Sequence, residues 1–120
     1  MKYPRLLLIV VLSLSACTKK PATSESLQGR LAAAVAVSTP DSRNELLSKL
    51  AMDAANAKDI QVTTKAIESI QNPSLSDDSA AACAQALSKK GESKGATEVA
   101  RLIRNPDLRD KALRLIAQGQ

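Results

Sequence analysis

The most constraining feature of this sequence is a repeat of 33 residues. Residues 65–77 read KAIESIQNPSLSD and residues 98–110 read EVARLIRNPDLRD, so the Asn-Pro pair, the following Leu and the Asp recur in step. The same shift aligns Pro40 with Pro73 and Pro106. A fixed period of this length is typical of architectures in which one supersecondary unit stacks on the next.

Small or apolar residues recur at the same positions of each unit. The aligned triplets are Ala33, Ala66 and Val99; Val37, Ile70 and Ile103; Leu47, Ala80 and Leu113; Leu50, Cys83 and Ile116; and Ala51, Ala84 and Ala117. On each side of the proline, these residues have the spacing of three and four that is typical of a helix face. Proline fits the first turn of a helix and pushes the preceding residue out of helical conformation, so it separates two helices in each unit.

The pattern predicts six helices, over residues 26–38, 41–57, 60–71, 76–89, 94–104 and 107–118. Asp59 and Ser93 are candidate N-caps for the helices that follow them. Ser42 with Glu45 has the spacing of a capping box. Gly91 is expected to end a helix in the left-handed conformation.

We therefore expect an all-α domain over residues 27–120. We expect three antiparallel helical hairpins of about 33 residues, stacked as a short right-handed solenoid. A compact six-helix bundle grown by duplication is the alternative. The hairpin period with its proline resembles the tetratricopeptide class of repeats over residues 27–118. The resemblance is one of architecture, because the aromatic and glycine positions that mark that class are missing, and it carries over no binding residues.

Composition agrees with helices packed on small side chains. The chain contains no Trp, Phe or His, and its single aromatic residue is Tyr3, so the core must consist of Ala, Leu, Ile and Val. Charge is uneven along the chain. Residues 41–78 carry seven acidic and four basic side chains, whereas residues 89–114 carry four acidic and eight basic ones. We therefore expect an acidic middle and a basic C-terminal end.

The N-terminal segment has the composition of an export signal. Lys2 and Arg5 precede a nearly unbroken apolar run over residues 6–14. This run is shorter than the ~20 residues that a membrane-spanning helix needs. A positive segment, a short apolar run and then small residues predict a cleaved signal over residues 1–16.

The end of this segment carries the most specific motif of the chain. Leu14-Ser15-Ala16-Cys17 resembles the lipobox of bacterial lipoproteins. The resemblance implies that Leu14, Ser15 and Ala16 direct cleavage and that Cys17 is lipidated. Residues 17–26 are rich in Lys, Thr, Ser and Pro, so we expect a flexible tether. In Gram-negative lipoproteins, an Asp directly after the lipidated Cys tends to retain the protein in the inner membrane. This chain has Thr18 at that position, so the resemblance implies the periplasmic face of the outer membrane if the host is Gram-negative.

Catalysis is not expected. Without histidine the chain has no imidazole base and no His/Cys cluster for zinc. Asp77 and Asp78 are adjacent, and adjacent residues of a helix do not face each other. We expect no enzyme activity, no metal and no cofactor other than the covalent lipid on Cys17. Cys83 shares a repeat position with Leu50 and Ile116, so burial is expected, and a reactive thiol is the alternative.

Basic side chains gather in the last predicted hairpin, at Arg101, Arg104, Arg109, Lys111 and Arg114. The pairs 101/104 and 111/114 have the spacing of residues that share a helix face. We expect this basic set to dock a protein partner, with lipid phosphates or the acidic middle of a second copy as alternatives. Nucleic acid is not expected, because the set contains no aromatic side chain for base stacking.

Together these features favour a membrane-anchored lipoprotein of the cell envelope. We expect a protein–protein interaction module that assists the assembly, piloting or modulation of an envelope complex. The alternative is an immunity or exclusion lipoprotein that binds and neutralises a toxin or transfer apparatus.

Overall fold

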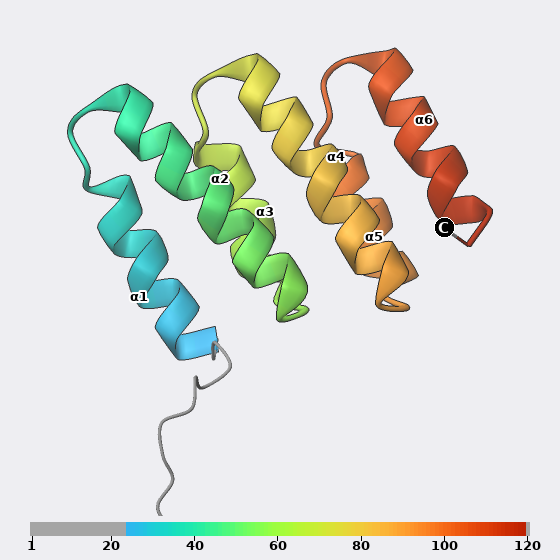
Figure 1. Cartoon of the computed structure of the whole chain (residues 1–120), viewed down its shortest axis with the longest axis horizontal. Coiled ribbons are helices and arrows are strands. Elements are labelled where there is room, and N and C mark those ends of the chain that lie inside the picture. The colour runs from blue at the N-terminus through green and yellow to red at the C-terminus, as the bar shows by residue number, and fades with distance from the viewer. Residues whose placement is uncertain (1–23, 120) are drawn as a thin grey trace, which may run out of the picture.

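The computed structural model describes residues 24–119, and over this range the chain folds into helices joined by short loops (Figure 1). The helices are α1 (Ser24–Val35), α2 (Pro40–Asn56), α3 (Ile60–Ser69), α4 (Pro73–Lys89), α5 (Ser93–Ala100) and α6 (Pro106–Ala117). The all-α class is confirmed for these residues. Because α1 begins at Ser24, the last residues of the expected tether 17–26 are helical.

The helices touch only near neighbours in the sequence. Helices α2, α4 and α6 lie side by side, with α3 and α5 behind them (Figure 1). α2 contacts α3 and α4, α4 contacts α5 and α6, and α1 packs against α2 and α3. Within residues 24–119, neither α1 nor α2 contacts α5 or α6. The first two helices therefore touch the last two only through α3 and α4, which lie between them.

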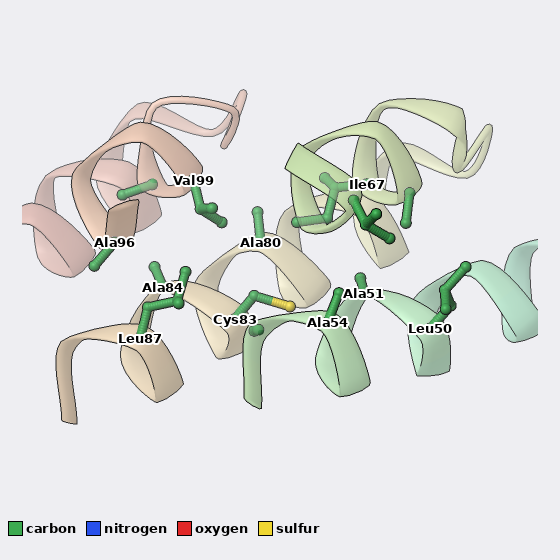
Figure 2. Close-up of a cluster of buried hydrophobic side chains, with 14 of the residues drawn as sticks. Leu50, Ala51, Ala54, Ile67, Ala80, Cys83, Ala84, Leu87, Ala96 and Val99 are labelled. Carbon is green, nitrogen blue, oxygen red and sulfur yellow. The ribbon is translucent and has the colours of Figure 1, made fainter. Parts of the chain in front are cut away.

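Small side chains form much of the core. Ala51 and Ala54 of α2 and Ala80 and Ala84 of α4 are all at most 1 % exposed, and they point toward the helices that carry Ile67 and Val99 (Figure 2). Larger side chains from the helices behind, among them Ile67, close the space between them (Figure 2). Alanine lets helix backbones approach closely, and interiors are packed with few voids. The repeated apolar positions of the sequence are thus the contact surfaces between helices.

The three prolines that are 33 residues apart each occupy the first position of α2, α4 and α6. The residue before each one is the N-cap, in extended conformation. The Oδ1 atom of Asn72 accepts the Leu75 backbone N–H at 3.0 Å. Asn105 accepts the Leu108 N–H at 3.2 Å in the same way. Thr39, at the equivalent position of α2, makes no such bond.

Two expected helix caps are confirmed. The Asp59 carboxylate accepts the Val62 backbone N–H at 3.0 Å and caps α3. Gly91 follows the end of α4 with φ +81°. The N–H of Gly91 and that of the next residue donate back to Ser88 and Leu87, which is the hydrogen-bond pattern of a Schellman motif.

Two other expected caps are wrong. Ser42 and Glu45 do not form a capping box at the helix start, because α2 already begins at Pro40 and both residues lie inside the helix. Ser93 is the first helical residue of α5 and not its N-cap, which is Glu92. In both cases the helix begins one or more residues earlier than the polar residue suggested.

Candidate functional site

The surface of the row α2, α4 and α6 carries a groove between each pair of neighbouring helices. The α4/α6 groove has a volume of about 360 Å³. Its lining residues are mostly apolar: Ala81, Ala82, Gln85, Leu108, Lys111, Ala112, Leu115 and Ile116. Lys111 of the predicted basic set lines this groove, which is the strongest candidate binding site among the described residues.

The second groove is the repeat equivalent of the first. The α2/α4 groove has a volume of about 290 Å³ and is lined by Ser48, Lys49, Met52, Leu75, Asp78, Ser79, Ala82 and Cys83. Each of these residues lies 33 positions before a residue that lines the α4/α6 groove. The two grooves are therefore formed by equivalent positions of the repeat that carry different side chains.

The side-chain differences change the chemistry of the two grooves. In the α2/α4 groove, the Ser48 and Ser79 hydroxyls are 2.7 Å apart and hydrogen bonded to each other. Their equivalents in the α4/α6 groove are alanines. Asp78 is replaced by Lys111 and Lys49 by Ala82, so a groove with one acidic and one basic side chain becomes a groove with one basic side chain. The α4/α6 groove can thus hold apolar side chains while Lys111 meets a carboxylate of the same ligand.

The structure does not bring the whole basic set together. Helix α5 ends at Ala100, so Arg101 is its C-cap and Arg104 lies in the loop that follows. The expectation that Arg101 and Arg104 share a helix face is therefore wrong. The physical reason is Asp77 of α4, whose carboxylate accepts the backbone N–H of Arg104 at 2.8 Å and that of Asn105 at 3.1 Å. These bonds hold the loop in a non-helical conformation.

Arg109 is partly committed to this loop. Its Nη1 atom donates to the Ile103 carbonyl at 3.2 Å. Two repeats earlier, Arg43 donates to the Val37 carbonyl at 2.8 Å in the same way, whereas the middle repeat has Ser76 at this position. Arg109 is half-buried in consequence and supports the loop before α6.

Lys111 and Arg114 lie on α6 and are exposed. Lys111 lines the α4/α6 groove. Arg114 holds the repeat position of Ser48 and Ala81, which line grooves toward the following helix. Arg114 therefore faces away from α4. Of the five predicted docking residues, Lys111 lines the α4/α6 groove and the other four do not.

Sequence reasoning missed the grooves themselves. A signal was present in Ala81 and Ala82 of α4, which fall outside the apolar stripe of Ala80, Cys83 and Ala84. Alanines at surface positions leave space between neighbouring helices, and Ala82 lines both grooves. Small surface residues on a helix, combined with the 33-residue repeat, predict a shallow groove between each pair of neighbouring long helices.

Cys83 is buried, as expected, with 1 % of its surface exposed. Burial raises the pKa of its thiol to about 12. The nucleophilic form of cysteine is the thiolate, so this environment disfavours a reactive role.

The lipobox residues cannot be placed in the structure. Leu14, Ser15, Ala16 and Cys17 lie outside the described residues. Among residues 24–119, no helix is both long and apolar enough to cross a bilayer. The same residues contain no cluster of three side chains suited to a metal ion.

Comparison with known proteins yields no relative. No family profile, curated protein or solved structure matches this chain.

Proposed function

We propose that the helices form three hairpin units stacked as a short solenoid. Two observations support this arrangement. The helices touch only neighbouring ones, as stacked units do. The same hydrogen bond also joins each pair of units: Asn44 accepts the Gln71 backbone N–H at 3.0 Å, and 33 residues later Asp77 accepts that of Arg104 at 2.8 Å.

We propose that this stack is a protein–protein interaction module. The observation that carries the proposal is the α4/α6 groove, which combines an apolar floor with the amino group of Lys111 at its wall. A groove of this kind fits an amphipathic helix or an extended segment whose apolar side chains are followed by an acidic one. Binding is favoured over catalysis because the chain contains no histidine and its one described thiol is buried.

We further propose that the module is held at a membrane of the cell envelope. The support is the order Leu14-Ser15-Ala16-Cys17 after a short apolar run. Lipid chains on Cys17 would tether the domain, because two or more acyl chains give stable membrane attachment. The periplasmic face of the outer membrane is the proposed site in a Gram-negative host. There the module would assist the assembly, piloting or modulation of an envelope complex.

The groove is tested by reversing the charge of Lys111 in otherwise intact protein. Lys111→Glu should lower the recovery of partner protein from cross-linked native membranes by about tenfold, which corresponds to a loss of about 1.4 kcal/mol of binding free energy. Lys65→Glu is the matched control, since Lys65 is exposed on α3 and lines neither groove. Equal recovery with both variants would show that the groove is not the docking site.

The anchor is tested by mass spectrometry of protein from native membranes. The expected N-terminal residue is Cys17 with a mass increment from acyl chains. Cys17→Ala should remove the increment and release the processed domain or block its processing. An N-terminus elsewhere, or an unmodified Cys17, would contradict the anchor and leave the groove proposal standing.

A further inference from the structure

The first unit of the stack carries a third, end-facing groove. The α1/α2 groove has a volume of about 260 Å³ and is lined by Arg30, Ala33, Ala34, Val37, Leu46 and Leu50. Leu46 is 44 % exposed. Among the described residues, Val35 is the other large apolar side chain that is exposed to this extent. Apolar surface of this kind marks a contact site more often than does a scattered single residue.

The repeat shows what this groove lacks. The equivalent residues of the second unit are all buried: Thr63, Ala66, Ile67, Ile70, Ser79 and Cys83. Those of the third unit are buried as well: Ala96, Val99, Ala100, Ile103, Ala112 and Ile116. In those two units, the preceding unit covers part of this surface, as the contacts of α2 with α3 and of α4 with α5 show. The α1/α2 groove is therefore an exposed copy of a surface that is buried at both contacts between consecutive units.

The hydrogen-bonding groups of the contact between units are also without partners at the two ends of the stack. Asn44 and Asp77 each accept a backbone N–H from the following unit. The next residue in this series is Asp110 on α6, which is exposed and has no partner among the described residues. At the opposite end, the backbone N–H groups of Ser38 and Thr39 hold the donor positions. They donate to no group within residues 24–119.

The apolar surface beside Asp110 matches this series. Leu113 and Ala117 of α6 hold the repeat positions of Ala80 and Ala84, which are buried between units. Leu113 is half-buried and Ala117 is exposed. The outer side of α6 thus presents an acceptor and an apolar strip, and the outer side of α1 and α2 presents two donors and an apolar groove.

We propose that copies of this chain associate head to tail through these two surfaces. Asp110 of one copy accepts the N–H groups of Ser38 and Thr39 of the next, and the strip with Leu113 covers the α1/α2 groove. Such an interface joins two different surfaces, so it can continue from copy to copy. The inference rests on the stacked arrangement proposed above and is independent of the α4/α6 groove and its partner.

Sedimentation equilibrium of the full chain, solubilised in a density-matched detergent, tests this association. The wild-type protein should exceed the mass of one copy as its concentration rises. Asp110→Ala should weaken association by about tenfold or more, whereas Asp110→Asn should retain it, since Asn44 serves in the same position. Glu98→Ala is the control, because position 98 and its equivalent Lys65 are both exposed.

A mixing experiment distinguishes head-to-tail contact from a symmetric dimer. Leu46→Asp should block the groove end, and Ala33→Glu provides a second variant at an exposed helical position if the first fails to fold. At a concentration close to the dissociation constant of the wild-type protein, each variant alone should be mostly monomeric. A mixture of Asp110→Ala with a groove variant keeps one working pair of surfaces, so it should form dimers and nothing larger.

Three results would overturn the proposal: a wild-type protein of single-copy mass at all concentrations, association unchanged by these variants, or a mixture that stays monomeric. None of them bears on the Lys111→Glu result. The folding stability of Asp77→Ala, measured where the protein is monomeric, tests the Asp77 contact between units separately from association.

Discussion

The carboxylate of Asp77 on α4 lies 2.8 Å from the backbone nitrogen of Arg104, 27 residues away in the sequence. Asn44 and Gln71 have the same relationship one repeat earlier, at 3.0 Å. In both cases a side chain near the start of a long helix holds the loop after the next short helix. The bond satisfies a loop donor and fixes where the next long helix begins.

Removal of the Asp77 carboxylate should destabilise the domain. We expect Asp77→Ala to lower the free energy of unfolding by about 1–2 kcal/mol, because two backbone donors lose a charged acceptor. Asp77→Asn should cost less, since asparagine serves at position 44. Urea unfolding measures both. The neighbouring Asp78→Ala is the control, and an equal effect from it would contradict the role of Asp77.

The residues that end the long helices give a second test. Lys58 has φ +62° and stands 33 positions before Gly91, with φ +81°. Left-handed conformation costs an L-residue about 1–2 kcal/mol, part of which is offset by the greater freedom of glycine in the unfolded chain. Lys58→Gly should therefore raise the unfolding free energy by about 0.5–1 kcal/mol.

Gly91→Ala should lower the unfolding free energy by a similar amount. A Cβ atom at Gly91 would meet nothing within 4 Å, so the cost is conformational and not steric. Gly29→Ala is the control, because it also meets no atom within 4 Å and lies inside helix α1. Alanine favours helix interiors, so this control should be stabilising. A Gly91→Ala protein as stable as wild type would contradict the assigned strain.

The sequence alone predicts most of the secondary structure because the repeat marks each boundary three times. Pro73 and Pro106 locate the long helices, although α4 begins at Pro73 and not at the predicted residue 76. Asp59 and Gly91 are correctly assigned as caps. The joints between units were not predicted. Asp77 and Asp110 recur in step, but a recurring carboxylate does not reveal that it holds the loop of another unit. Helix α5 was predicted too long for the same reason, since its end is set by that distant contact.

Alanines at one repeat position should differ sharply in their tolerance of larger side chains. Ala84 of α4 is 1 % exposed within the core, whereas Ala117 is exposed on α6. Ala84→Leu should cost about 1–3 kcal/mol of unfolding free energy through overpacking. Ala117→Leu should have little effect at concentrations where the protein is monomeric. Thermal unfolding of the pair compares them, and equal melting temperatures would be inconsistent with the core described.

The Cys83 thiol should react slowly in the folded protein. Because burial raises its pKa to about 12, the thiolate population at pH 8 is roughly a thousandfold below that of an ordinary thiol. Iodoacetamide labelling of the Cys17→Ala chain, in which Cys83 is the remaining cysteine, should be at least about a hundredfold slower in buffer than in denaturant. Rapid labelling under native conditions would contradict the burial.

The same raised pKa implies a pH dependence of stability. The folded state favours the protonated thiol, so its contribution is complete below the ordinary thiol pKa and is lost as pH rises toward 12. Cys83→Ala removes this dependence. The difference in unfolding free energy between wild type and Cys83→Ala should therefore shift against the wild type as pH rises above about 9.

Photo-cross-linking in intact cells tests the central claim most directly. A photoreactive residue at Gln85 would sit in the α4/α6 groove, and one at Lys65 would sit on α3 away from it. We predict that position 85 forms a cross-link to one envelope protein, that position 65 does not, and that Cys17→Ala weakens the cross-link. An identical set of products from both positions, or none from position 85, would contradict a groove that binds a partner at the membrane.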